Sequence, residues 1–358
     1  MTEYVWPAPE TGAAGLTTAL RSLGFADWFE AAAGDAFSHD PWVAFDRAQR
    51  WVGHCSQPLG AAAALFVHGG DIERIEAEQA LGSSAISWLS RHGVLRAEGS
   101  RLRSAYCLIS RPGLGLFANW PLRTAAGRLV CQQTYLSAGS YDCANAILDL
   151  GRGRRALDLG CGGGILTATL ARLYDETVAI DVDPLAIWLT ELNLALNGAQ
   201  ARVVHGDWTD GLKEAGKYDL IVSNPPWRIV PAGVRYPDAV ARVGQGADGL
   251  DQVRRVLGIA VGALALGGKA ILRFDVPHRH SGGHPLQDTL EVLADAGISA
   301  EFQSLGYIGI DEQAQTSANA CAHLNGDIGD LRGRFLENYA QRGITRLESV
   351  LCHLTARF

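Results

Sequence analysis

The stretch LDLGCGGGILTATLARL, residues 157–173, decides the fold. An apolar run of strand-forming length leads into a loop rich in glycine, and a second apolar run with helix-forming residues follows. Glycine lets the chain turn tightly and brings backbone N–H groups close to a bound ligand. The stretch therefore predicts a buried strand, a ligand-binding loop and a helix.

The spacing of the glycines separates two classes of cofactor. A dinucleotide-binding loop has the pattern G-x-G-x-x-G, which would place its third glycine where the chain has Ile165. The alternative pattern is an acidic residue followed by a glycine at every second position. Asp158, Gly160, Gly162 and Gly164 match it without a gap. The loop therefore disfavours a nicotinamide dinucleotide.

On either side of this loop, apolar runs alternate with helical stretches. The expected strands are RRALDLG (154–160), ETVAIDV (176–182), ARVVHGD (201–207), YDLIVSN (218–224), KAILRFD (269–275), ISAEFQSLG (298–306) and SVLCHLTAR (349–357). Such alternation predicts the α/β class, with a doubly wound and mostly parallel sheet. Ligands of these sheets bind outside the carboxyl ends of the strands.

Three more motifs fall at expected strand ends. Asp181 ends the second strand, HGDW (205–208) ends the third and SNPPW (223–227) ends the fourth. The two prolines of SNPPW cannot continue a central strand, because proline has no N–H for the ladder. In this order, the motifs resemble those of the class I S-adenosylmethionine-dependent methyltransferases. The resemblance covers residues 130–358 and implies a Rossmann-like, seven-stranded methyltransferase sheet.

The resemblance also implies a role for each strand end. Asp158 is expected near the methionine end of S-adenosylmethionine, and Asp181 is expected to accept both ribose hydroxyls. Asp207 is expected beside the adenine amino group, with Trp208 beside the ring. Cys161 is interpreted as a small filler of the loop. The complete expected cofactor-binding set is Tyr135, Asp158, Gly160, Cys161, Gly162, Gly164, Asp181, Val182, Asp207, Trp208 and Asn224.

The Asn-Pro-Pro-aromatic motif resembles that of methyltransferases acting on nitrogen, which include N6-adenine DNA, guanine-N2 rRNA and release-factor glutamine methyltransferases. The side-chain oxygen of Asn224 and the carbonyl of Pro225 can each accept one N–H of the target, which orients the nitrogen for attack. Pro226 stiffens the turn, and Trp227 can stack on a planar substrate. The glutamine-methylating group usually has Tyr at the last position, so Trp227 is a departure.

Two further segments are expected near the substrate. By the resemblance, TYLSAGSYDCANAIL (134–148) packs over the cofactor, with Ser140 and Tyr141 as candidates for its carboxylate or for substrate. The long polar stretch at 228–253 predicts a substrate loop, with Arg235, Tyr236 and Asp248 as contacts. A solvated loop with no such role is the alternative.

Residues 1–122 predict a mainly helical, winged-helix-like domain, and residues 123–358 the catalytic domain. A short helical stretch after Gly70 and a second one at 84–92 precede two short strand-like runs around Gly99-Ser100, in the order of a winged helix. RPGLGLFANWPLRTAAG (111–127) is predicted to connect the domains. Few basic residues lie on the second helix, so a substrate lid or dimer interface is favoured over nucleic-acid binding.

The composition and several short motifs limit the remaining classes of function and location. The 358 residues carry a net charge of −7, against the basic footprint of a general nucleic-acid binder. Seven cysteines form no CxxC pair, and the expected location is a reducing cytoplasm. The apolar run at 256–272 predicts a buried helix, turn and strand and is too short to span a bilayer. His278, His280 and His284 have no adjacent acidic or thiolate partner, so no metal is expected.

The sequence therefore predicts a methyltransferase acting on an amine or amide nitrogen of a small molecule, peptide or protein, with S-adenosylhomocysteine as product. Methylation of an rRNA or other nucleic-acid base is the second hypothesis. A third moves the methyl group to oxygen or carbon and needs a base such as His205 or His278. A regulator that only senses the cofactor is a non-enzymatic alternative. High Ala, Gly and Arg with little Lys resembles GC-rich bacterial sources, where such genes often serve natural-product pathways.

Overall fold

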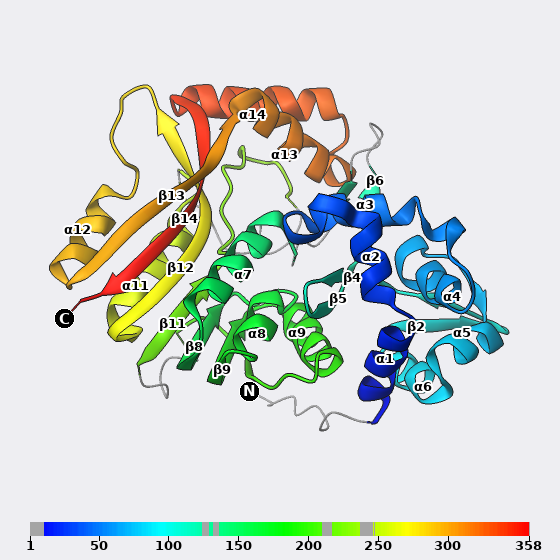
Figure 1. Cartoon of the computed structure of the whole chain (residues 1–358). Helices are drawn as coiled ribbons and strands as arrows, with labels where there is room; N and C mark the ends of the chain where they lie inside the picture. The colour runs from blue at the N-terminus through cyan, green and yellow to red at the C-terminus, as the bar shows by residue number, and fades with distance from the viewer. Residues whose placement is uncertain are drawn as a thin grey trace.

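The computed structural model describes residues 11–123, 129–131, 136–209, 217–236, 246 and 248–357. Its centre is a seven-stranded sheet in the order β10-β9-β8-β11-β12-β14-β13 (Figure 1). The strands are β8 (Gly153–Leu159), β9 (Tyr174–Asp181), β10 (Arg202–His205), β11 (Tyr218–Ser223), β12 (Leu264–Arg279), β13 (Ile298–Gly309) and β14 (Ile344–Ala356). Only β14 runs antiparallel to its neighbours, so the predicted mostly parallel sheet is confirmed.

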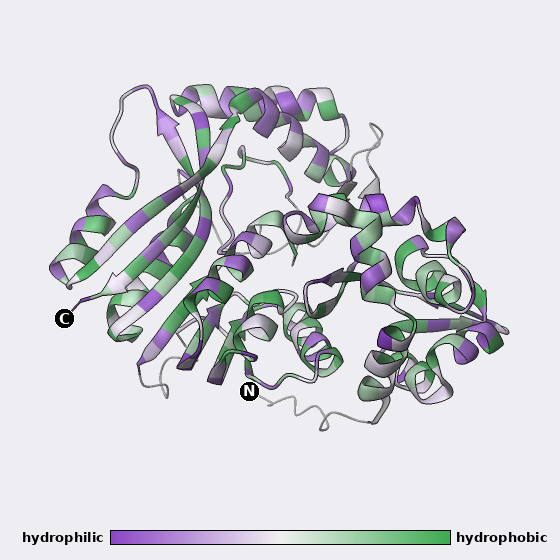
Figure 2. Ribbon diagram, in the orientation of Figure 1, coloured by the Kyte–Doolittle hydropathy of each residue, from purple (hydrophilic) through white to green (hydrophobic). Residues whose placement is uncertain are grey.

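Helices cover both faces of this sheet. One face carries α7 (Ala138–Leu150), α8 (Ile165–Leu170) and α9 (Pro184–Leu196), and the other carries α11 (Asp251–Ala263) and α12 (Gln287–Asp295). The two cores follow the alternation of the strands, since Ile271 packs into the first and Leu272 into the second. Figure 2 shows the central strands as mainly hydrophobic where the helices cover them. This two-sided burial explains why the strands appear as nearly continuous apolar runs in the sequence.

The helix, turn and strand expected at 256–272 are present with one difference. The helix α11 ends at Ala263 and β12 begins at the next residue. The register shifts here, because Tyr218 pairs with Leu264 whereas Leu220 pairs with Lys269. The predicted turn is therefore a bulge in the strand. Gly267 has a φ of 72° within it, a conformation that suits glycine.

The N-terminal part contains the expected helix, helix and hairpin. Its helices are α1 (Thr11–Ser22), α2 (Phe25–Ala33), α3 (Pro41–Gln49), α4 (Leu59–Ala63), α5 (Arg74–Leu81) and α6 (Ser83–Arg91). Its small sheet has the order β1-β3-β2, from β1 (Ile72–Glu73), β2 (Leu95–Glu98) and β3 (Arg101–Ser104). The α1 helix packs on α6, which completes a winged-helix-like arrangement.

The predicted connection at 111–127 is wrong over most of the part that the structure describes. It contains β5 (Leu114–Asn119), which pairs with β4 (Tyr106–Arg111), and β6 (Pro121–Arg123), which pairs with β7 (Leu129–Cys131). Pro112 and Gly113, which suggested a linker, form the tight turn of the β4–β5 hairpin, where Gly113 has a φ of 72°. The proposed boundary between residues 122 and 123 thus falls within β6.

This hairpin is fastened to α9 by two amide side chains. Asn193 accepts from the N–H of Phe117 at 2.7 Å and donates to its carbonyl at 3.0 Å. One helical turn later, Asn197 makes the same pair of bonds with Gly115, at 3.0 and 2.8 Å. The two side chains bond alternate residues of β5 as a neighbouring strand would.

A pair of helices lies between the last two strands in the chain. The helices α13 (Ile310–Asn325) and α14 (Ile328–Gln341) pack on each other and lie across the ends of β13 and β14 (Figure 1). A third apolar core forms beneath them, and it includes Ile229 and Tyr236 from the segment after β11. No helix within the described ranges has both the length and the hydropathy needed to cross a membrane.

Candidate active site at the carboxyl edge of the sheet

The predicted motifs meet at one edge of the sheet. The β8, β9 and β11 strands are parallel, so the loops after Leu159, Asp181 and Ser223 leave the same edge. The loop after β8 is bound to β9, since the N–H groups of Gly160 and Cys161 both donate to the carbonyl of Ile180, at 2.9 and 3.2 Å. This edge is where ligands of doubly wound sheets bind.

The glycine loop has the conformation that its sequence predicts. Gly160, Gly162 and Gly164 have φ angles of 79°, 54° and 78°, a region that other residues rarely adopt. The loop is also packed tightly, because a Cβ on Gly164 would lie 2.8 Å from the Cα of Thr190. On Gly160 the same atom would lie 3.6 Å from the Trp208 ring. The glycines therefore permit both the turn and the close approach of neighbouring groups.

Polar side chains of α9 form hydrogen bonds with this loop. Thr190 donates to the carbonyl of Gly162 at 2.9 Å, and Asn193 donates to that of Gly163 at 2.8 Å. Thr190 also lies 3.3 Å from the sulfur of Cys161, which is buried and fills space, in keeping with the prediction. The sequence did not identify Thr190 as a loop contact. Its signal was a polar residue within a mainly apolar helix.

Two buried carboxylates flank the loop. Asp158 is fully buried and accepts from Thr167 Oγ1 at 2.6 Å through Oδ2, while its Oδ1 has no partner among the described residues. Burial raises the pKa of Asp158 to about 7. Asp181 accepts from the N–H of Gly162 at 3.0 Å and from that of Asp183 at 2.9 Å. Its pKa is also raised by burial.

These groups fit S-adenosylmethionine. The unpaired oxygen of Asp158 is a buried acceptor that suits the ammonium of the methionine moiety, since a buried acceptor without a partner is costly. Asp181 ends its strand with a carboxylate beside the loop, as ribose recognition requires. Asp183 caps α9 by accepting from the N–H of Leu185 at 2.9 Å.

The residues expected to bind adenine already interact with other groups of the protein. Asp207 forms an ion pair with Arg255 and accepts from the N–H and hydroxyl of Thr209, at 3.1 and 3.0 Å. Its pKa is lowered despite partial burial, because these bonds favour the carboxylate. Trp208 is buried, with Arg255 5.5 Å from its ring centroid. Adenine binding by these residues and by the exposed Val182 stays a prediction.

Asn224 is oriented by α7. Its Nδ2 donates to the hydroxyl oxygens of Ser137 and Ser140, both at 3.1 Å. Ser137 is the N-cap of α7 and also accepts from the N–H of Ser140 at 3.2 Å. The adjacent Ser223 donates to the carbonyl of Leu159 at 2.7 Å, which ties the end of β11 to that of β8. Ser140 was named as a ligand contact from the sequence, and the role of Ser137 was missed.

The rest of the SNPPW motif anchors the chain. Pro225 is buried and Pro226 half-buried. Trp227 is also half-buried and packs against both the core beneath α11 and the core beneath α13 and α14. The guanidinium of Arg228 lies 4.6 Å from the Trp227 ring centroid. One part of the indole is therefore already covered by a cation, which favours this ring position.

Several residues predicted to contact substrate have contacts within the protein. Tyr141 is fully buried under the guanidinium of Arg111, at 4.7 Å. Tyr236 packs into the core beneath α13 and α14. Asp248 is bound by Arg254 and by the N–H of Leu250. The side chain of Arg235 is exposed. Contacts of these residues with substrate stay predictions, and Tyr135 lies outside the described residues.

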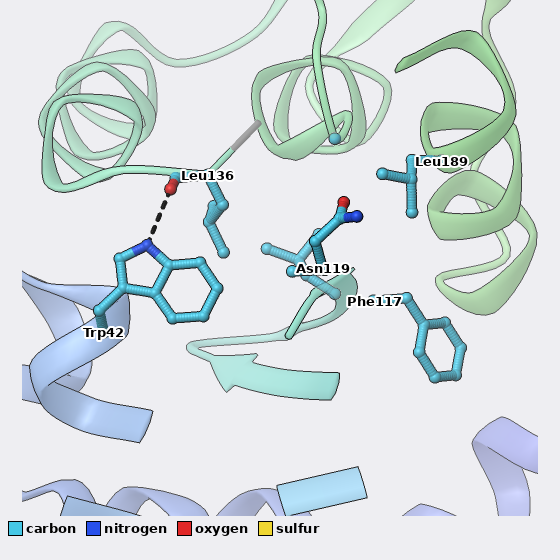
Figure 3. Close-up of a pocket in the computed structure, with 8 residues that line it drawn as sticks. Trp42, Phe117, Asn119, Leu136 and Leu189 are labelled. Carbon is cyan, nitrogen blue, oxygen red and sulfur yellow. Dashed lines mark hydrogen bonds between the residues drawn. The ribbon is translucent and has the colours of Figure 1, made fainter. Parts of the chain in front are cut away.

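A small pocket adjoins the glycine loop from the N-terminal side (Figure 3). It is lined by Trp42 of α3, the end of β5, Leu136, Gly163 and Leu189. Trp42 donates through its indole nitrogen to the carbonyl of Leu136 at 3.0 Å, the dashed bond in Figure 3. Within the described ranges, no group of three potential metal ligands occurs. His278 pairs instead with Glu348 at 2.7 Å.

Comparison with known proteins agrees with this geometry. Residues 132–240 match the model of the Methyltransferase small domain. Ribosomal RNA small subunit methyltransferase C of Stutzerimonas stutzeri is 33% identical over 160 residues, which are 43% of this chain and 40% of that protein. Release factor glutamine methyltransferase of Bordetella pertussis is 34% identical over 122 residues, 32% of this chain and 45% of that protein.

A third relative is the ribosomal protein uL3 glutamine methyltransferase of Neisseria meningitidis. It is 35% identical over 133 residues, which are 34% of this chain and 42% of that protein. The chain thus spans less than half the length of each of these relatives. Their similarity, the sheet order and the loop geometry support a class I methyltransferase domain that uses S-adenosylmethionine around residues 132–240.

Proposed function

We propose that this protein transfers the methyl group of S-adenosylmethionine to an amine or amide nitrogen. The observation that carries the proposal is the orientation of Asn224. Both serine contacts engage its side-chain nitrogen, so the side-chain oxygen is left to accept an N–H from a substrate. A carboxamide held in this way recognises a nitrogen that still carries hydrogen.

The motif offers a second acceptor beside the first. The ring of Pro225 fixes its own φ, and its carbonyl can accept the other N–H of a planar amino or amide group. Two acceptors orient the nitrogen lone pair and offset positive charge as it develops. Trp227 supports a planar substrate and helps to exclude water. No general base is needed, since the proton can leave after transfer.

The cofactor supplies a sulfonium carbon that is open to attack. Within the chain, Asp158 would hold the ammonium of the methionine moiety and Asp181 the ribose hydroxyls. The glycine loop lets the backbone approach the cofactor closely. The pocket beneath Trp42 supports a role for the N-terminal part in shaping this end of the site. These assignments follow from the buried acceptors and the packing of the loop.

The favoured substrate is a small molecule or a peptide or protein. A net charge of −7 is unfavourable for general binding to nucleic acid, and Arg91 is the only Lys or Arg on α6. A second candidate is an rRNA base, because one of the relatives above is named for ribosomal RNA. The third candidate, transfer to oxygen or carbon, has no support from the residues around Asn224.

Calorimetry and a methyl-transfer assay test the proposal together. Wild-type protein is titrated with S-adenosylmethionine and then assayed with amines, peptides and RNA, with products identified by mass spectrometry. We expect Asn224→Ala to lose transfer by about 100-fold or more while retaining cofactor affinity. We expect Asp181→Ala to lose cofactor affinity first. Equal loss of affinity in both variants would contradict the role of Asn224, and methylated oxygen or carbon would contradict the reaction.

A further inference from the structure

A second cavity lies between the turn of the β4–β5 hairpin and the C-terminal ends of α7 and α8. It has a volume of about 270 Å³ and is lined by Arg111, Pro112, Leu114, Leu148, Arg152, Thr169, Arg172 and Leu173. Arg152 and Leu173 directly precede β8 and β9. The cavity is therefore at the opposite edge of the sheet from Asn224, outside the site described above.

The lining of this cavity has an unusual charge. Three of its side chains are arginines and none is acidic. Arg111 is 2% exposed, and its Nε and Nη1 have no hydrogen-bond partner among the described residues. Its Nη2 donates to the neutral Asn145 at 2.8 Å. A guanidinium stays protonated even when buried, so Arg111 is a buried cation without a counter-ion in the chain.

Among the described residues, the neighbours of Arg111 do not supply a negative charge that would balance its guanidinium. Burial lowers the pKa of Arg111, and the positive charge of Arg172 acts in the same direction. Tyr141 stacks on the guanidinium, but its hydroxyl is neutral near pH 7 because burial raises its pKa. Arg172 donates to the carbonyl of Gly113 at 2.9 Å, and no described carboxylate pairs with Arg152 or Arg172.

Helix ends explain part of this cluster. Arg152 and Arg172 follow the C-termini of α7 and α8, where cations stabilise the helix dipole. That explanation does not extend to Arg111, which ends a strand, is buried and lines the cavity. A buried cation without a counter-ion and two exposed cations that line the same cavity favour an anion of more than one charge.

We propose that this cavity binds the phosphoryl group of a small phosphorylated organic molecule. The uncompensated charge of Arg111 would stabilise the phosphoryl group, and the exposed Arg152 and Arg172 would donate to its oxygens. Leu114, Leu148 and Leu173 provide an apolar wall for the organic part. The volume is small for a ligand site, which fits a small phosphomonoester.

Titration of the full-length protein with inorganic phosphate tests the proposal. The titration is run without S-adenosylmethionine and at constant ionic strength, so it does not depend on methyl transfer. We expect binding, and an increase in Tm that sodium chloride at equal ionic strength does not produce. Arg172→Gln should weaken binding at least about tenfold, the effect of losing one charge-assisted hydrogen bond. Arg154→Gln is the matched control, because Arg154 is an exposed neighbour outside the cavity.

Substitution of the buried Arg111 gives a second test of the proposal. Arg111→Met should abolish phosphate binding without lowering Tm in phosphate-free buffer, because the substitution removes an uncompensated buried charge. A lower Tm for Arg111→Met together with unchanged phosphate binding by Arg172→Gln would assign these arginines to packing and overturn the proposal. Absence of phosphate binding to the wild type would also overturn it.

Two further ligands identify the source of the phosphoryl group. Phenyl phosphate should bind more tightly than inorganic phosphate, since its ring can contact the leucines of the wall. A ten-nucleotide single-stranded RNA should not depend on Arg111 or Arg172. If the RNA required both arginines while phenyl phosphate failed to bind, the small-molecule source would be wrong.

Discussion

The side-chain nitrogen of Asn224 lies 3.1 Å from the hydroxyl oxygen of Ser140, across a contact that joins the end of β11 to the first turn of α7. Ser137 completes the pair at the same distance. An amide can turn over by 180°, exchanging its oxygen and nitrogen. In the structure both serine hydroxyls accept from Nδ2, and that orientation leaves the side-chain oxygen as the acceptor that the motif presents.

Removing both serine hydroxyls tests this positioning. The double variant Ser137→Ala/Ser140→Ala should lower kcat for the proposed methyl transfer by about 10- to 100-fold, because Asn224 is no longer held. The Kd for S-adenosylmethionine should remain unchanged by calorimetry. Ser299→Ala serves as the control, since Ser299 lies on the edge strand β13 and bonds only a carbonyl there. Unchanged turnover in the double variant would show that the serines do not position Asn224.

The buried Asp158 should make stability depend on pH. Its pKa is raised to about 7 in the folded protein, above the ordinary value of 3.8, so the folded state binds the proton more tightly. This contribution to stability is complete below pH 4 and is lost as pH rises towards 7, by at most about 4 kcal/mol. Asp158→Asn removes it. Urea unfolding of both proteins at pH 5 and 8 should show a larger difference at pH 8.

The same group should make cofactor affinity depend on pH in the opposite sense. An ammonium pairs with the carboxylate and not with the acid, so affinity for S-adenosylmethionine should fall as pH decreases below about 7. Asp158→Asn should bind more weakly throughout and lose this dependence. Calorimetry between pH 6 and 8 measures both effects. A wild-type affinity that is constant over this range would place the ammonium elsewhere.

The amide contacts of α9 should contribute measurably to stability. Asn193→Ala leaves the buried N–H of Phe117 without a partner and should cost about 3 kcal/mol in unfolding free energy. Asn325→Ala is the matched control, because Asn325 makes the same pair of bonds with the backbone of Arg235 at an exposed position. Water can replace those bonds, so the control should cost less than about 1 kcal/mol. Equal losses in urea unfolding would contradict a special role for burial.

Substitutions at two glycines distinguish the cost of an unfavourable backbone conformation from the cost of steric overlap. Gly99 and Gly164 have similar φ angles, 62° and 78°, but a Cβ would meet nothing within 4 Å at Gly99. Gly99→Ala should therefore cost about 1 kcal/mol, the conformational part alone. At Gly164 the added methyl would lie 2.8 Å from the Thr190 backbone. Gly164→Ala should cost more than about 3 kcal/mol and weaken cofactor binding. Equal losses of Tm would contradict this comparison.

Local patterns predicted much of this structure. Each strand of the large sheet has an apolar run, and the Asp and Gly positions of the loop limit its conformation, so both were visible in sequence. The hairpin at 106–119 was missed because Pro112-Gly113 marks a turn or loop without showing that the flanking residues pair as strands. The partners of Asn193 and Asn224 are 76 and 84 residues away, at Phe117 and Ser140. No local pattern specifies contacts at that separation.

The amide ladder between α9 and β5 has a consequence for how this protein can vary. On β5, Asn193 and Asn197 bond main-chain groups of Phe117 and Gly115, and every residue except proline offers the same N–H and carbonyl. These bonds alone leave the β5 side chains open to substitution, whereas the two amides must keep their spacing of four positions. Burial of Leu116 and Phe117 in the core still limits which side chains the strand can carry. For this ladder to form, a different N-terminal part would need an extended segment that arrives in register.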